Sequence, residues 1–381
     1  MIQSKLPNST DSIFSVMSKM AHETGALNLS QGFPDFESDA ELIQLVADQM
    51  KAGHNQYAPM PGDKGLRQAI SDKMNTLHEK RYDPDHEITV TAGATQAIFT
   101  ALAATIHKGD EVILFAPAYD CYEPTVTLFG GIPKAIQLQP PAYRPDWNKV
   151  EDTINSKTKM IIINTPHNPS GAVWSEEDMK QLEALAEKHD LLVLSDEVYE
   201  HIVFDGRQHY SAARFEALSK RTFITASFGK TFHNTGWKMG YCLAPKPLME
   251  EFRKVHQFNV FSVNHPIQKA LATYLQQPSH YEELPKRYQQ KRDFFLQELK
   301  GSRFSFTPSE GTYFQLLNYN DITEEKDTEF AERLTKEFNI ATIPTSVFNK
   351  NQQDFKQLRI CFAKEEKTLK KAAAILREIQ R

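Results

Sequence analysis

Short apolar runs alternate with amphipathic helical segments through the middle of the chain. The runs are EITVTAG, EVILFAP, KMIIINTP, LLVLSDE and RTFITAS, and helical periodicity covers residues 94–107 and 176–189. Several runs are β-branched and apolar on both faces, as strands covered by helices on both sides must be. The pattern predicts an α/β fold built on a large, doubly wound, mainly parallel sheet.

The pattern changes from about residue 285 onward. A long charged helix, PKRYQQKRDFFLQELK, precedes the strand-like FSFTPSEGTYFQLL, a further helix, ATIPTSVF, QLRICFA and a terminal helix. Helices that segregate from a few strands predict a smaller α+β domain. We expect residues 1–45 to form an N-terminal arm and part of the small domain, 46–280 the large domain, and 281–381 the small C-terminal domain.

The composition of the 381-residue chain indicates a globular protein with a small-molecule ligand. The net charge is -5 with both signs interspersed, so no basic stripe indicates nucleic acid and no polybasic arm indicates a membrane. The three cysteines are widely spaced, and His54, His107 and His167 show no metal-ligand spacing. We therefore expect no nucleic-acid, membrane or metal partner, and a reduced, cytoplasmic location.

Polar residues follow strand after strand in the predicted sheet. Thr91 to Gly93, Asn164 to Asn168, Asp196, and Ser227 to Lys230 each come directly after an apolar run. In open α/β sheets, ligands bind beyond the carboxyl ends of the strands. The sequence therefore predicts one binding site that collects all four groups.

Two of these residues indicate particular chemistry. Although most lysines are solvated surface charges, Lys230 lies between Ser227 and Lys238 in a glycine-bounded segment, SFGKTFHNTGWKMGY. A hydroxyl, loop amides and a second ammonium suit a phosphate, and a partly desolvated lysine is nucleophilic toward an aldehyde. Asp196 needs a partner because a buried carboxylate is costly. That partner is a helix N-terminus, an ion pair or a cationic cofactor nitrogen, and Tyr199 reaches the same ligand if the following turn is helical.

A series of motifs occurs in a family-specific order, namely NLSQGFPDF, NQYAPMPG, VTAGATQA, PAYDCY, NTPHNPSG, SDEVY, SFGKTFHNTGWKMGY and QLRICFAK. With them the chain resembles the fold-type I, class I aminotransferases from end to end. Its resemblance is closest to bacterial methionine aminotransferases and to the branch of kynurenine aminotransferases and glutamine transaminase K. This implies a pyridoxal 5'-phosphate (PLP) enzyme that moves the amino group of methionine and aromatic amino acids, with kynurenine as a further donor, to a 2-oxo acid by a ping-pong Schiff-base mechanism.

The resemblance also implies roles for the residues that contact the cofactor ring. Lys230 becomes the Schiff-base lysine and the base at the substrate's Cα, and Asp196 pairs with the pyridine nitrogen. Asn168 and Tyr199 hydrogen-bond the phenolic oxygen, with Asn168 also on the substrate side, and Tyr119 stacks on the ring.

The same resemblance assigns the cofactor phosphate to Ala94 and Thr95 at a helix N-terminus, together with Ser227 and Lys238. Many relatives have arginine at the last position, so Lys238 offers a point charge in place of a bidentate fork. Tyr57 matches a tyrosine that reaches the phosphate of the neighbouring subunit, which implies a homodimer with shared active sites.

On the substrate side, the resemblance makes Arg359 the partner of the substrate carboxylate, with a backbone NH from Gly32. Our candidates for the lining of the side-chain pocket are Ile13, Phe14 and Phe261, each of which also fits ordinary core packing. His233 lies in the lysine segment, where a structural hydrogen bond and a place near the cofactor are both open.

Three other functional classes compete with the aminotransferase assignment. A carbon-sulfur β-lyase acting on cysteine conjugates shares the lysine, aspartate and arginine, so the motifs leave it open as an alternative. A nicotinamide or nucleotide enzyme would need GxGxxG or GxxxxGK[ST] after a strand, and neither occurs. The sequence also shows no basic DNA-binding region of the kind that a transcription regulator built on this fold carries.

Overall fold

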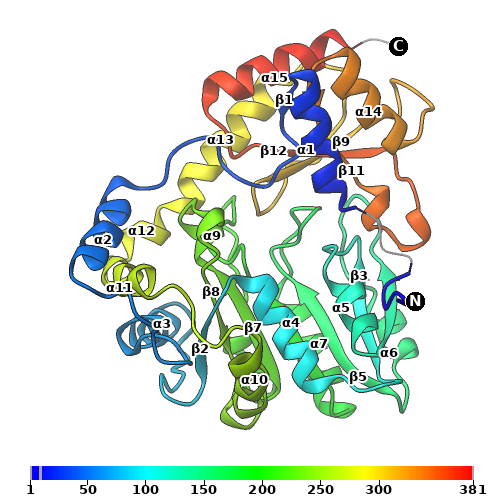
Figure 1. The fold of residues 1–381 in the computed structure, drawn as a ribbon. Coiled ribbons are helices and arrows are strands. Elements are labelled where there is room, and N and C mark those ends of the chain that lie inside the picture. The colour runs from blue at the N-terminus through cyan, green and yellow to red at the C-terminus, as the bar shows by residue number, and fades with distance from the viewer. Residues whose placement is uncertain (1, 8–10, 380–381) are drawn as a thin grey trace.

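The computed structural model describes residues 2–7 and 11–379, so residues 1 and 8–10 of the expected N-terminal arm and residues 380–381 lie outside the described residues. A large α/β part carries the central sheet, and a smaller part holds α1 (Ile13–Thr24) from near the beginning of the chain and α15 (Glu366–Glu378) from its end (Figure 1). Among the described residues, no helix combines the length and apolar character that a membrane span requires.

The central sheet has seven strands in the order β2-β8-β7-β6-β5-β3-β4. β8 runs antiparallel to both neighbours, and every other neighbouring pair is parallel, which confirms the predicted mainly parallel sheet. The pattern did not reveal β4, which is only partly buried and contains Pro133, or the four-residue β8. The strands are β2 (Ile88–Thr91), β3 (Glu111–Ala116), β4 (Ile132–Gln137), β5 (Thr158–Asn164), β6 (Leu192–Asp196), β7 (Thr222–Ser227) and β8 (Gly240–Leu243).

Helices cover both faces of this sheet. Successive strand residues point to opposite faces, so Leu114 and Ile162 pack under one helical layer while Ile113 and Ile161 pack under the other. The first layer contains α4 (Ala94–Thr105), α5 (Tyr122–Leu128) and α10 (Lys246–Asn259), and the second includes α7 (Glu176–Lys188). The doubly covered α/β architecture is therefore confirmed.

The smaller part contains a three-stranded antiparallel sheet of β11 (Ile343–Pro344), β12 (Gln357–Cys361) and β9 (Phe314–Asn318). The prediction of a strand over residues 304–317 is wrong for most of its length, because the chain bends at Gly311 to donate its NH to the Gly171 carbonyl at 2.8 Å. A Cβ at Gly311 would lie 2.8 Å from the Ile202 carbonyl oxygen, so only glycine allows this approach.

The beginning of the chain joins the smaller part, since β1 (Leu27–Asn28) pairs with β10 (Ile340–Ala341). The division at residues 45 and 280 stays a proposal, supported by this pairing. The other helices are α1 (Ile13–Thr24), α2 (Ala40–Lys51), α3 (Lys64–His78), α6 (Trp147–Thr153), α8 (Glu216–Ser219), α9 (Phe228–Thr231), α11 (His265–Tyr274), α12 (Ser279–Glu282), α13 (Leu284–Glu298), α14 (Asp327–Glu337) and α15 (Glu366–Glu378), with 3-10 turns η1 (Ala212–Arg214), η2 (Thr235–Trp237), η3 (Ser346–Phe348) and η4 (Lys350–Gln352).

Candidate active site

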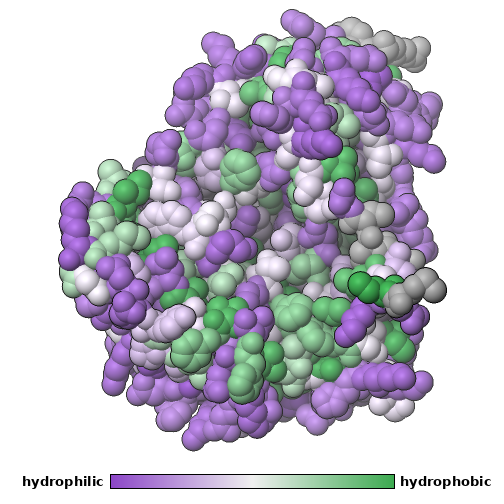
Figure 2. All heavy atoms as spheres, in the orientation of Figure 1, coloured by the Kyte–Doolittle hydropathy of each residue, from purple (hydrophilic) through white to green (hydrophobic). Residues whose placement is uncertain are grey.

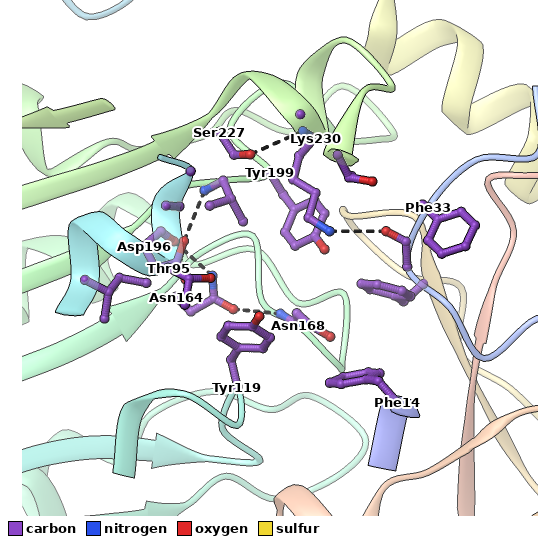
Figure 3. Close-up of a pocket in the computed structure, with 18 of the residues that line it drawn as sticks. Phe14, Phe33, Thr95, Tyr119, Asn164, Asn168, Asp196, Tyr199, Ser227 and Lys230 are labelled. Atoms are coloured by element: carbon purple, nitrogen blue, oxygen red, sulfur yellow. Dashed lines mark hydrogen bonds between the residues drawn. The ribbon is translucent and has the colours of Figure 1, made fainter. Parts of the chain in front are cut away.

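A cavity of about 310 Å³ lies at the carboxyl ends of the parallel strands. Gly93, Asn164, Asp196 and Ser227, which each follow or end a strand of the central sheet, all line it. The predicted meeting of the strand ends is therefore observed (Figure 3). Segments from the two chain ends close the cavity with Phe14, Gly32, Phe33 and Arg359.

Lys230 extends from the short helix α9 into this cavity (Figure 3). The Ser227 hydroxyl caps α9 by accepting a hydrogen bond from the Lys230 backbone NH at 3.3 Å, and the Lys230 ammonium donates to the Gly32 carbonyl at 3.1 Å. Burial lowers the pKa of Lys230 to about 8, and the charges of Arg359 and Lys238 add to this lowering. Roughly one tenth of the amine is therefore neutral at pH 7, far more than for an ordinary lysine, and the neutral form is the nucleophile.

Asp196 ends β6 with its carboxylate at the cavity wall. The Tyr122 hydroxyl donates to it at 2.5 Å, and the backbone NH of Val198 donates at 3.3 Å. Burial raises the pKa of Asp196 to about 6, although Tyr122 and Lys230 oppose the rise. Among the described residues Lys230 is the one cation with a resolved effect on this carboxyl, so the cationic partner that Asp196 needs fits a protonated ring nitrogen of a ligand.

The N-terminus of α4 offers an anion site beside these two groups. Its N-cap residue Gly93 has φ 80 and makes no side-chain capping bond, so the amides of Ala94 and Thr95 remain directed toward the cavity end. A Cβ built at Gly93 would lie 3.6 Å from the Lys238 Nζ, which places that ammonium next to the helix end. With the Ser227 hydroxyl, these groups fit a phosphate.

Three predicted ring contacts also line the cavity (Figure 3): Tyr119, Asn168 and Tyr199. Tyr199 was expected to reach the ligand if the turn after the strand was helical. Residues 198–201 form a turn and not a helix, yet the Tyr199 side chain lines the cavity. Asn168 accepts a hydrogen bond from Arg359 at 2.8 Å, and its backbone NH donates to the Asn164 side chain at 2.8 Å. Asn168 therefore stands between the strand ends and the predicted carboxylate-binding arginine.

Arg359 lies in β12 and is 1% exposed. Its guanidinium donates to Asn168 and, at 2.8 Å, to the Ser30 carbonyl, and it stacks 3.9 Å from the centre of the Phe314 ring. Its Nε has no hydrogen-bond partner among the described residues. A buried arginine held by neutral groups at a cavity wall is suited to bind a carboxylate.

Four predicted residues do not line the cavity of the single chain. Ile13 packs against the hydrophobic core. Tyr57 is 81% exposed and meets Phe261 edge-on with ring centres 5.6 Å apart. His233 Nδ1 lies 2.9 Å from the Tyr288 hydroxyl, and burial lowers its pKa to about 4, which fits the structural role left open for it.

Sequence reasoning missed several residues of the site. Tyr122 holds Asp196, and its signal was its position three residues after Tyr119 in PAYDCY. Tyr313 donates to the same Gly32 carbonyl as Lys230, at 2.6 Å. That contact joins residues 281 positions apart, so no local pattern could reveal it.

The fold and the site together define a PLP-dependent enzyme. A lysine of lowered pKa, a buried carboxylate in the same cavity and a helix N-terminus with a nearby ammonium are the groups that the aldehyde, pyridine nitrogen and phosphate of PLP require. The adjacent arginine adds a place for a substrate carboxylate.

Comparison with known proteins agrees with this class. Residues 24–376 match the family model of aminotransferases of class I and II, and the chain belongs to this family. It is 47% identical to the methionine aminotransferase of Escherichia coli over 99% of this chain and 98% of that one. It is 35% identical to human kynurenine–oxoglutarate transaminase 3, over 94% of this chain and 86% of the relative. A crystal structure of an Escherichia coli protein with methionine aminotransferase function superposes with a TM-score of 0.97 at 47% identity, covering 99% of both chains.

The resemblance seen in the sequence is thereby confirmed. The chain is a transaminase of fold type I with PLP as its cofactor.

Proposed function

We propose that this transaminase moves the amino group of methionine and of aromatic amino acids, including kynurenine, to a 2-oxo acid. When bound, PLP supplies an acceptor for the electrons left when the substrate's Cα–H bond breaks. Lys230 takes and returns the Cα proton through its Nζ, Asp196 holds the proton of the ring nitrogen, and Arg359 binds the substrate carboxylate. The observation that carries the donor preference is the apolar lining around Arg359.

Aromatic rings surround the carboxylate-binding arginine. The guanidinium carbon of Arg359 lies 3.9 Å from the centre of the Phe314 ring and 5.0 Å from that of Phe14, and both rings line the cavity with Phe33. A thioether or a flat ring fits such a lining, because sulfur–aromatic and ring–ring contacts are favourable. The names of the methionine and kynurenine relatives support the same donors.

A dicarboxylate donor would meet no suitable second cation. Among the described residues that line the cavity, Arg359 is the one arginine, while Lys230 and Lys238 have their own roles at the aldehyde and the phosphate. A second carboxylate would have to be buried among aromatic rings without a partner, which is costly. Aspartate should therefore be a poor donor.

We further propose that the enzyme works in the cytoplasm as a homodimer that shares its active sites. Figure 2 shows hydrophobic residues gathered over α4 and α10 on one face. Phe258, near the end of α10, is 86% exposed. Tyr57 and Phe261, whose rings meet edge-on, are 81% and 44% exposed. Large exposed aromatic residues of this kind are typical of an interface. The three free cysteines suit a reducing compartment.

The test compares kcat/KM for methionine, phenylalanine, kynurenine, glutamine and aspartate with one common 2-oxo acid. Methionine and phenylalanine should exceed aspartate by at least about tenfold. Phe14→Ala should reduce kcat/KM for methionine much more than for alanine, whereas Val16→Ala, an exposed position on the same helix, should change neither. A preference for aspartate would refute the apolar pocket. Pyruvate released from a cysteine conjugate without any acceptor would reveal β-lyase activity instead.

A further inference from the structure

The turn after β6 has two faces with different functions. Asp196 and Tyr199 line the cavity, whereas Glu197, Glu200 and His201 are directed away from it and are 1%, 8% and 9% exposed. Their side chains lie in a group of buried polar residues that we call the buried ionic cluster. It consists of Lys73, His78, Glu197, Glu200, His201, His209 and Tyr241.

One end of the cluster is centred on Lys73. This lysine belongs to α3, which lies beside the β2 edge of the central sheet (Figure 1). Its ammonium donates to Glu200 at 2.6 Å, to the Tyr241 hydroxyl at 2.8 Å and to His201 Nε2 at 3.1 Å, so all three of its protons are used. Burial lowers the pKa of His201 to about 3, which keeps it a neutral acceptor. Glu200 stays charged, because Lys73 outweighs the effect of burial and holds its pKa well below the usual value.

The other end of the cluster is centred on Glu197. Its carboxylate accepts hydrogen bonds from the Ser195 hydroxyl at 2.8 Å and from the Ala212 NH at 3.0 Å, and it lies 2.9 Å from His209 Nε2. The two carboxylates therefore tie the turn to α3, to β8 through Tyr241, and to the segment 209–212.

Stability alone does not account for this arrangement. The cluster buries two carboxylates but only one lysine, which pairs with Glu200, and a buried ion pair is usually no more stabilising than apolar residues of the same volume. What it provides is a fixed position for a turn that lacks regular structure. The backbone of the turn makes few hydrogen bonds: Glu197 NH to the Thr225 carbonyl at 2.9 Å, Glu200 NH to the Glu197 carbonyl at 2.9 Å, and Ile202 NH to the Tyr199 carbonyl at 2.8 Å.

We propose that the buried ionic cluster is a positioning device for the transamination site. Through Glu197 and Glu200 it holds the segment 196–201 so that Asp196 meets the ring nitrogen and Tyr199 meets the phenolic oxygen of PLP. The residues of the cluster touch neither cofactor nor substrate and act only through these two side chains. This role rests on the transaminase function proposed above.

The experiment uses the holoenzyme of Lys73→Met/Glu200→Gln, which removes both charges at nearly constant volume. We expect the melting temperature to change little, since a paired charge has been replaced by neutral groups. The value of kcat should fall about 10- to 100-fold at nearly constant KM for methionine, because small displacements of reacting groups are costly. The pH titration of the bound cofactor's absorbance should also shift, which reports the position of Asp196 directly.

Two further variants keep the result interpretable. Asp327→Asn alters a buried carboxylate of the smaller part that accepts bonds from the NH and hydroxyl of Ser346 at 2.7 and 2.6 Å, away from the cavity. It should lower the melting temperature and leave kcat and the spectrum unchanged. Tyr241→Phe removes one hydroxyl of the cluster and should lower kcat and shift the spectrum in the same direction as the double variant. It tests the proposal by itself if the double variant does not fold.

Wild-type kcat and spectrum in both cluster variants would overturn the proposal. The proposal would also be overturned if kcat fell in proportion to the melting temperature in all variants, including the Asp327→Asn control. The spectrum is recorded without an amino donor, so inactivity of the wild-type enzyme toward methionine would contradict the proposed donor and not the positioning role.

Discussion

The nucleophilicity of Lys230 gives the sharpest quantitative prediction. Burial lowers its pKa to about 8 from the usual lysine value of 10.5. At about pH 7.5 the neutral fraction of the amine is then roughly one quarter, against roughly one thousandth for an ordinary lysine, a gain of about 200-fold in the reactive form. Because the neutral amine attacks the cofactor aldehyde, the capture of PLP should depend on this pKa.

The assay measures the rate at which apo-protein forms a borohydride-reducible link to PLP as a function of pH. We expect a midpoint near pH 8 for the wild-type protein and no link in Lys230→Ala. Arg359→Gln removes a cation that lowers the pKa of Lys230, so the midpoint should rise. Asp196→Asn removes a carboxylate that raises this pKa, so the midpoint should fall.

Arg359→Lys is the matched control, because it keeps the positive charge while losing the guanidinium geometry. Its midpoint should stay close to that of the wild type. A wild-type midpoint near 10.5, or identical midpoints in Arg359→Gln and Arg359→Lys, would refute the electrostatic account of the lysine. A link that forms on another lysine would refute the assignment itself.

Three other predictions address the cofactor partners and the subunit interface. In the apo-protein, burial raises the pKa of Asp196 from 3.8 to about 6, so the folded state binds more protons than the unfolded state in this range, and the free energy of unfolding falls as pH rises through it. Asp196→Asn should therefore raise the free energy of unfolding above about pH 6 by up to about 3 kcal/mol in thermal melts, while severely lowering holoenzyme turnover. Lys238→Met should weaken PLP binding about tenfold or more, most strongly at low ionic strength, whereas Lys238→Arg should bind PLP at least as tightly in the same fluorescence titration. Lys230→Ala and Tyr57→Phe proteins, each weakly active alone, should regain partial activity after joint refolding, and proven heterodimers without that gain would place Tyr57 outside the partner's site.

Much of the site can be predicted from the sequence, because parallel strands end at the same edge of their sheet. The apolar runs before Asn164, Asp196 and Ser227 are recognisable locally, and the geometry of parallel strands then brings their ends together. Lys230 follows one of these ends within three residues, so it was predictable in the same way. These residues indeed line one cavity.

Other contacts depend on the tertiary fold and have no local signal. Gly32 and Arg359 come from opposite ends of the chain, and only the family resemblance placed them at the site. The reach of Tyr199 was made conditional on a helical turn, whereas residues 198–201 form a turn in which Glu200 is bonded to Lys73 and Glu197 to Ser195. A buried ion pair between Lys73 of α3 and Glu200, 127 residues apart, cannot be inferred from periodicity.

The charges around the cavity link substrate binding to proton transfer. Arg359 and Lys238 both lower the pKa of Lys230, and both are placed to bind anions, the substrate carboxylate and the cofactor phosphate. An anion bound at Arg359 compensates its charge and so weakens its effect on the lysine. The basicity of Lys230 should therefore increase when a substrate carboxylate is in place. The same arginine that selects an amino acid thus strengthens the base that removes the Cα proton, which favours proton transfer when the correct ligand is bound and leaves the amine neutral and nucleophilic when it is absent.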